Sequence, residues 1–203
     1  MTNNLSTLKE SLEKRHSHYN IGSEWVSPKE EVVKMLEDVL NLVPTHFNAQ
    51  TVRMILLTGE KHKEHWTIIE NAFINIMGVE RYEAQTKEKI HTAFMSGAGT
   101  VLFFDDVQTT KDLQEQFPAY AGNFPSWALQ VQGSHQFATW IGLTELGFGA
   151  SLQHYIGMVD GEVKEHAGAS EKWEFIGHMP FGNPLSNPTS KPKKDIKEVL
   201  KVF

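Results

Sequence analysis

The chain has 203 residues, with 19 Lys and Arg against 25 Asp and Glu and a formal net charge of −6. Its composition, 40% hydrophobic and 22% charged, is typical of a globular domain and excludes the disordered, collagen-like and disulfide-scaffold classes. Cysteine is absent, which excludes thiolate metal sites and cysteine nucleophiles. We expect a single domain over residues 1–203, in which residues 181–203 form an extended connector and tail.

The distribution of apolar and charged residues indicates the location of the protein and which kinds of partner it lacks. The first residues are polar, and the longest apolar stretches are far shorter than the ~20 residues that cross a bilayer. We therefore expect a cytoplasmic protein with no membrane span. The acidic balance argues against a nucleic-acid partner. The one basic cluster is the tail, where residues 191–203 hold five Lys and two acids, so the rest of the chain carries about −9.

The predicted elements alternate between helices and strands. A first helix ends near Lys14, and Ser27-Pro28-Lys29-Glu30 is typical of a capping box that begins a helix over 28–42. The near-continuous β-favouring run at 51–57 predicts a strand covered on both faces. Further strands are predicted over 100–104, 150–155 and 173–181, and further helices over 61–77, 84–95 and 125–146. This alternation predicts a layered α/β domain.

The helix predicted over 125–146 has apolar residues around most of its circumference, with small residues between them. Such a helix is expected to be central and closely packed, and it could also form a subunit interface.

Ten histidines make a metal site the first chemistry to test. His62 and His65 are spaced i, i+3 on a predicted helix, but the H-E-x-x-H pattern of zinc enzymes is missing, so we interpret the pair as part of a solvated helix face. No serine lies in a G-x-S-x-G elbow, and neither common nucleotide-binding glycine motif is present. A histidine metal hydrolase stays as one alternative, which predicts bound zinc.

Five segments carry a more specific signal. They are RHSHY at 15–19, VPTHFNAQTVRMILL at 43–57, GTVLFFDD at 99–106, FPAYAGNFPSWALQ at 117–130 and FGASLQHY at 148–155. Together, in this order, they resemble the nitroreductase superfamily of flavin mononucleotide (FMN) enzymes. The resemblance is strongest to the branch of fungal fatty-acid-response nitroreductase-like proteins and copper-inducible bacterial nitroreductases. It implies an α/β (α+β) fold, a three-layer mixed sheet flanked by helices, and an intertwined homodimer with two flavin sites at its interface.

The resemblance also implies which residues hold the FMN phosphate. Arg15 and Ser17 match the phosphate ligands, with His16 beside the ribityl chain or ring, and a guanidinium can grip phosphate through two hydrogen bonds. Lys191 and Lys193 match the tail cations that complete this site, where the family more often has Arg. Which of the two lysines is the ligand stays open.

Other matched residues lie at the flavin ring and at the substrate. Asn48 and Gln50 match the family's P-[ST]-x-x-N-x-Q turn, which we expect to act across the dimer. The loop under the ring, where a backbone N–H approaches the hydride-accepting nitrogen, is matched by Gln153, His154 and Tyr155. An aromatic wall of the substrate pocket is predicted at Phe117, Phe124 and Trp127, and ordinary core packing explains these three equally well.

One position departs from the family pattern. Several nitroreductases place a Lys two positions after the motif serine, where this chain has Tyr19. The cation that stabilises the reduced flavin is therefore unassigned. Arg53, in an apolar strand, is one candidate, although a structural ion pair is the favoured interpretation because a buried charge needs a partner.

The resulting functional hypothesis is an FMN-dependent enzyme that reduces quinones or nitroaromatic compounds with NAD(P)H by ping-pong hydride transfer. The cofactor supplies the chemistry, so no side chain needs to act as a nucleophile. The alternative is a flavin-binding regulatory or stress-response protein whose reductase activity is incidental.

Overall fold

The structure, a computed structural model, describes residues 4–189 and 191–203. Met1–Asn3 and Ser190, which belong to the predicted domain and connector, lie outside the described residues. The helices are α1 (Asn4–Lys14), α2 (Lys29–Leu42), α3 (Gly59–Met77), α4 (Val79–Gln85), α5 (Lys87–Ile90), α6 (Val107–Gln116), α7 (Phe124–Glu145), α8 (Asp160–Ala167) and α9 (Ile196–Val199). The strands are β1 (Ile21–Gly22), β2 (Val52–Thr58), β3 (Gly99–Asp106), β4 (Gly149–Ala150) and β5 (Trp173–Pro184).

The sheet has the order β1-β5-β3-β2, and β4 also pairs with β5. Every ladder is antiparallel, and a parallel pairing occurs in the isolated bridge between Ser17 and Ala150. The layered α/β (α+β) class is confirmed. Long strand β5 pairs with β1, β3 and β4, so it connects the N-terminal segment, the central strand and the loop that follows α7.

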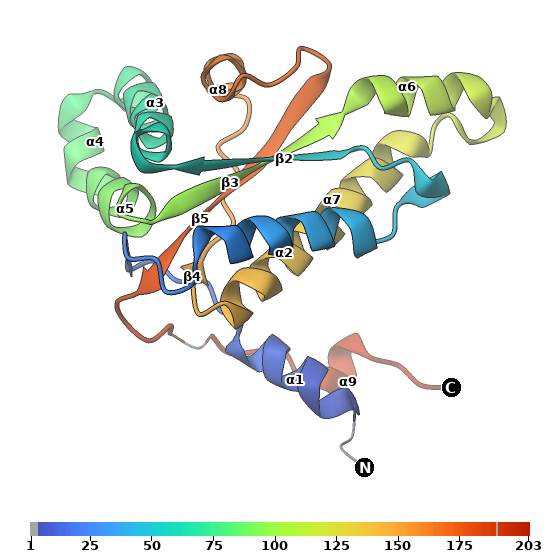
Figure 1. Cartoon of the computed structure of the whole chain (residues 1–203), viewed down its shortest axis with the longest axis horizontal. Coiled ribbons are helices and arrows are strands. Elements are labelled where there is room, and N and C mark those ends of the chain that lie inside the picture. Colours follow the sequence, from blue (N-terminus) through green and yellow to red (C-terminus); the bar gives the residue numbers. More distant parts are fainter. Residues whose placement is uncertain (1–3, 190) are drawn as a thin grey trace.

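Helices cover both faces of the sheet and make three layers (Figure 1). Leu102 and Phe104 of β3 point to a core that includes Trp66 and Ile69 of α3 and residues of α4, α5 and α8. Val101 and Phe103, on the opposite face of the same strand, pack with Val32 and Leu36 of α2 and Leu143 of α7. The alternation of side chains along β3 therefore supplies both cores, and all its residues but Asp106 are buried.

Several predicted boundaries are confirmed and three predictions are wrong in detail. The predicted helix over 84–95 is divided into α4, α5 and a short π-helical turn over His91–Met95. The predicted strand over 150–155 is reduced to β4 and one bridge between Gln153 and His178. Between them the Ser151 N–H donates to the Pro180 carbonyl at 3.3 Å, but Pro180 has no N–H to return the bond. Ser27 does not cap α2; its hydroxyl instead donates to the Leu146 carbonyl at 2.8 Å.

Helix α7 is central, but within one chain it is not covered on all sides. Its buried residues follow one stripe from Phe124 through Val131 and His135 to Leu143. On another face Leu129 is 61% exposed and Phe137 45% exposed, and a side chain added at Gly133 would meet nothing within 4 Å. An apolar helix face of this kind has no partner within the single chain.

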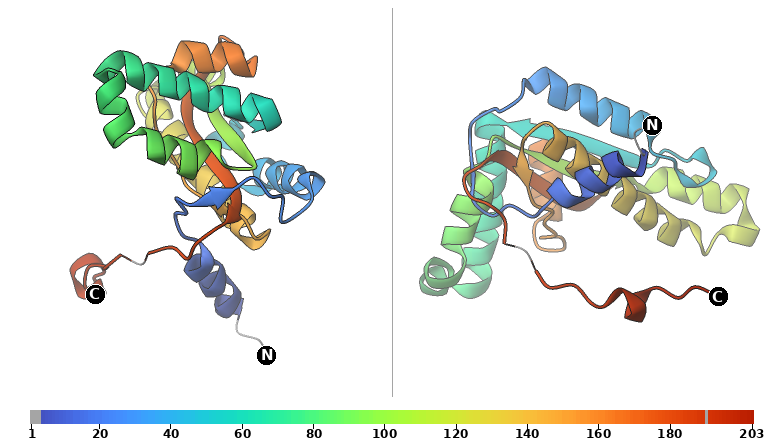
Figure 2. Two further views of the ribbon diagram at one scale, coloured as in Figure 1. Left: turned by 90° about the vertical axis from the view of Figure 1, so that its left-hand side faces the viewer. Right: turned by 90° about the horizontal axis from the view of Figure 1, so that it is seen from below.

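The connector after β5 leads the tail away from the body of the molecule (Figure 2). Its start is tied down by a hydrogen bond from the Leu185 N–H to the Asn20 carbonyl at 2.9 Å. Beyond it, apolar side chains of the tail, including Ile196, Val199 and Phe203, are exposed.

The prediction that His62 and His65 face solvent is wrong, because both side chains are buried on the sheet side of α3. The Trp66 indole donates to Thr100 Oγ1 at 2.9 Å, and Thr100 Oγ1 lies 2.8 Å from His62 Nδ1. His62 Nε2 lies 3.1 Å from the Met95 carbonyl. Polar neighbours in the sequence indicated a solvated face, but hydrogen bonds and ring contacts with Trp66 stabilise the buried position of these histidines.

These histidines make stability depend on pH. Burial lowers the pKa of His62 to about 4 and that of His65 to about 3, against about 6.5 in an unfolded chain. Below pH 6.5 the unfolded state binds more protons, so the free energy of unfolding falls as pH falls toward 4.

We predict that His62→Gln reduces this pH dependence by about 1.4 kcal/mol per pH unit between pH 5.5 and 4.5. Urea unfolding of both proteins across that range measures the effect. Parallel stability curves for variant and wild type would show that His62 is not neutral in the folded state.

Candidate functional site

The segment after α1 forms one wall of a cavity of about 610 Å³. Arg15, His16 and Ser17 line it together with Lys191 and Lys193 from the tail. Residues separated by more than 170 positions in the sequence thus meet in one place, and all five were predicted to bind FMN. The remaining lining residues are Leu12, Glu13, Tyr19 and Thr189.

The cavity has an excess of positive charge in an acidic protein. Arg15, Lys191 and Lys193 face a single lining carboxylate, Glu13, which pairs with Lys9 at 3.5 Å. Among the described residues, none of the three cations is paired with a carboxylate. The Arg15 guanidinium packs over the Trp140 ring at 4.5 Å, which holds its position without neutralising its charge. This set of donors suits a phosphate, because phosphate oxygens accept hydrogen bonds from cationic groups and from hydroxyls.

The loop after β4 is held beside this segment. Ser17 forms a bridge with Ala150, and the His18 N–H donates to the Ala150 carbonyl at 3.0 Å. Gly149 is required here, because a Cβ at this position would lie 2.8 Å from the His18 ring. Gln153, three residues after Ala150, pairs with His178 of β5. The predicted ring-binding residues Gln153, His154 and Tyr155 therefore come directly after the segment that pairs with Ser17.

Lys89 of α5 is a residue that the sequence alone did not reveal. Its Nζ lies 6.0 Å from the Tyr19 ring centroid and 5.5 Å from that of Phe94. Burial raises the pKa of Tyr155, and the positive charge of Lys89 opposes that rise. Lys89 therefore supplies a cation beside Tyr19, the position at which several nitroreductases have Lys. One lysine in a helix rich in lysine and glutamate gives no sequence signal.

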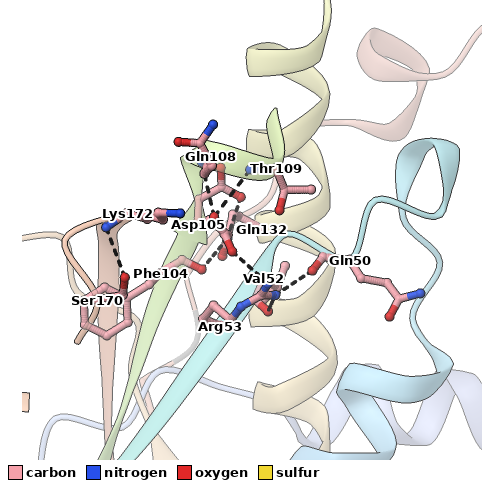
Figure 3. Close-up of polar contacts among 11 residues, drawn as sticks. Gln50, Val52, Arg53, Phe104, Asp105, Gln108, Thr109, Gln132, Ser170 and Lys172 are labelled. Atoms are coloured by element: carbon pink, nitrogen blue, oxygen red, sulfur yellow. Dashed lines mark hydrogen bonds and ion pairs between the residues drawn. The ribbon is translucent and has the colours of Figure 1, made fainter. Parts of the chain in front are cut away.

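Arg53 forms the structural ion pair that the sequence favoured (Figure 3). Its Nη2 lies 2.9 Å from Asp106 Oδ2, and its Nη1 donates to the carbonyls of Gln50 and Val52 at 2.6 and 3.0 Å. These contacts occupy the guanidinium at the end of β2 and brace the turn that precedes the strand.

That turn places Asn48 and Gln50 away from the cavity of Arg15. Neither residue lines the cavity, and both are exposed. Phe47, Asn48 and Gln50 have positive φ angles of 50°, 52° and 50°, a conformation that asparagine tolerates but that is strained for Phe47 and Gln50. Strain of about 1–3 kcal/mol per residue is retained mainly at sites where function requires the geometry.

The aromatic residues predicted to wall a substrate pocket form one cluster with Phe47. Its ring centroid lies 5.1 Å from Phe117, 5.4 Å from Phe124 and 6.0 Å from Trp127. Phe124 is fully buried, so it packs beneath the cluster, whereas Trp127 lines a cavity of about 480 Å³ together with Pro44–Phe47 and residues of α7. Within one chain this cavity shares no lining residue with the cavity of Arg15.

Two other features are absent from the described part of the chain. Over residues 4–189 and 191–203, no three His, Asp or Glu side chains are grouped closely enough to hold a metal ion. In the same residues no helix has the length and apolar character required to cross a membrane.

Comparison with known proteins places this geometry in a family. The nitroreductase family model matches residues 12–183. The Saccharomyces cerevisiae protein HBN1 is 32% identical over 173 residues, which cover 85% of this chain and 83% of HBN1. The nitroreductase FRM2 of the same yeast is 30% identical over 174 residues, covering 86% and 84%.

Among solved structures, the nitroreductase CinD from Lactococcus lactis in complex with chloramphenicol superimposes with a TM-score of 0.88. It shares 33% sequence identity, and the match covers 97% of this chain and 99% of CinD. Because the family model spans most of the chain and both yeast relatives are at least 30% identical over more than four-fifths of their lengths, the chain belongs to the nitroreductase family of oxidoreductases.

Proposed function

We propose that the protein is a cytoplasmic, homodimeric FMN enzyme that uses NAD(P)H to reduce quinones or nitroaromatic compounds in a ping-pong reaction. The observation that carries the proposal is the meeting of Arg15, Ser17, Lys191 and Lys193 around one cavity. An unpaired guanidinium, a hydroxyl and two ammonium groups are a donor set for a phosphate monoester.

In this proposal FMN, when bound, accepts and donates the hydride, and the protein binds and orients it. Arg15, Ser17 and the two tail lysines hold the phosphate, with His16 beside the ribityl chain. Gln153, His154 and Tyr155 lie under the ring. Asn48 and Gln50 reach the ring from the partner subunit, because within one chain they stand apart from the phosphate cavity.

The substrate class rests on the aromatic cluster and on a relative. CinD has been solved in complex with chloramphenicol, nicotinic acid and 4-nitrophenol. In this chain the aromatic surface of Phe117 and Trp127, supported by buried Phe124, would face the flavin of the partner subunit and stack against a flat ring.

The proposal as a whole is tested by the visible absorption spectrum of the purified chain, followed by steady-state turnover. We expect flavin bands, release of FMN on denaturation, and oxidation of NADH or NADPH when a quinone or 4-nitrophenol is added. Flavin bands without turnover would favour the regulatory alternative. Bound zinc with no flavin would favour the metal hydrolase instead.

The phosphate assignment predicts selective losses of affinity. Arg15→Ala and Lys193→Ala each remove a charge-assisted hydrogen bond of about 1.5–3 kcal/mol, so FMN binding should weaken by roughly tenfold or more. Lys191→Ala distinguishes the two tail lysines.

The control ligand is riboflavin, which has no phosphate, and the control variant is Lys194→Ala, a tail lysine outside the cavity lining. Flavin titration should show the loss with FMN and not with riboflavin, and Lys194→Ala should bind both as wild type does. An equal loss with both flavins would mean that these residues only support the fold of the site.

The homodimer is predicted to form through the exposed apolar face of α7. Phe137→Glu places a charge on this face and should give a monomer in light scattering, with weakened flavin binding because the partner's turn is lost. Ile76→Glu is the matched control, since Ile76 is 66% exposed on α3 and should leave the dimer intact. A Phe137→Glu dimer that binds flavin normally would rule out this interface.

A further inference from the structure

His178 of β5 holds the loop of residues 153–155 by three hydrogen bonds. Its backbone N–H donates to the Gln153 carbonyl at 3.0 Å, and its carbonyl accepts from the Gln153 N–H at 2.9 Å. Its ring nitrogen Nε2 accepts from the Tyr155 N–H at 3.3 Å. Two of the three amide groups in the loop are therefore bonded to one residue of the sheet.

The amide left over is that of His154. Within the described part of the chain, no acceptor takes the His154 N–H, while the amides on either side are occupied. His154 is exposed, whereas Gln153 beside it is buried. Of the amides in residues 153–155, the one at His154 is thus the donor available to a ligand.

The orientation of the His178 ring depends on a second buried histidine. A backbone N–H can only donate, so His178 Nε2 must carry no proton, and the neutral ring then has its proton on Nδ1. Nδ1 lies 2.9 Å from His65 Nε2, which must accept that proton's hydrogen bond. His65 does not itself contact the loop; its ring neighbours are Trp66, His166 and His178.

Burial keeps the pair uncharged. The His178 side chain is fully buried, and desolvation holds its pKa well below the usual value, with His65 and His154 adding to the effect. Desolvation likewise lowers the pKa of His65 to about 3. Trp66 stacks on the His178 ring at 4.8 Å, which fixes the plane of the imidazole.

We propose that His65 and His178 are positioning residues for the loop of residues 153–155, here called the flavin loop. His65 sets the tautomer of His178, and His178 clamps the flavin loop by its hydrogen bonds, so that among the amides of this loop only the His154 N–H faces the flavin ring. Neither residue touches the cofactor in this arrangement. The part of the inference that concerns the flavin rests on the proposed function, whereas the hydrogen bonds from His178 to the loop exist whether or not flavin binds.

The test compares His65→Gln with His65→Asn. The longer Gln amide places an oxygen near the position of Nε2 and can still accept from His178, whereas Asn is too short to reach it. Without an acceptor, His178 Nδ1 loses its partner, and the tautomer with a proton on Nε2 opposes the Tyr155 N–H.

The first readout is amide hydrogen exchange of the full-length chain without added flavin. In His65→Asn we expect the Tyr155 amide to exchange about tenfold faster, while the Gln153 amide, bonded to the His178 backbone, keeps its protection. His65→Gln should behave as wild type. Equal acceleration at both amides, or no change at either, would overturn the clamp.

The second readout is the midpoint potential and visible spectrum of bound FMN, both of which should shift in His65→Asn and be restored in His65→Gln. A released Tyr155 amide with an unchanged flavin potential would overturn the role assigned to the clamp. Wild type that binds no flavin would refute the proposed function alone, because the exchange experiment needs no cofactor.

Discussion

The site depends on the antiparallel pairing of β5 with its neighbours. Strand β5 pairs with β3 along most of its length, with β1 and β4 near its end, and with Gln153 through His178. Gly182 allows β1 to approach, because a Cβ there would collide with the Gly22 carbonyl. The tail that holds Lys191 and Lys193 follows this strand, Gln153 pairs with it at His178, and Ser17 bridges Ala150 of β4, which is paired with it. Loss of its pairing would therefore dismantle the phosphate cavity and the loop at once.

The charge distribution of the chain complements this frame. Most of the molecule is acidic, while the proposed phosphate site collects three cations with a single lining carboxylate. Arg15 lies on Trp140 and not against an acid, so its guanidinium is positioned and still available. By contrast, Arg53 is committed to Asp106 and to two carbonyls, and it stabilises the turn before β2. Two arginines in one chain thus differ in role because one has an ionic partner and the other does not.

The interior beneath α3 is unusually polar for a core. His62, His65, His178 and Thr100 are buried there among Trp66 and Phe94. Hydrogen bonds to side chains and to the backbone compensate for the lost hydration of most of these polar groups, while His65 Nδ1 has no partner among the described residues. Each bond requires a defined proton position. Such a network specifies one geometry more strictly than an apolar core would. Because His178 of this network is hydrogen-bonded to Gln153 and Tyr155, a loop with little regular structure is held in a single conformation.

The sequence by itself determined the layered class, most helix and strand positions and the motifs that identify the family. Apolar periodicity predicted the helices of 61–77 and 125–146 closely, since long periodic segments are the most readable. Motifs also singled out Arg15, His16, Ser17, Lys191 and Lys193, which line one cavity, and their role in binding FMN stays a prediction. The tertiary structure alone decided that His62 and His65 are buried, that Ser27 bonds Leu146 instead of capping α2, and that Lys89 stands beside Tyr19. These features depend on contacts between residues distant in the chain, and local pattern carries no information about which distant partner satisfies a polar group.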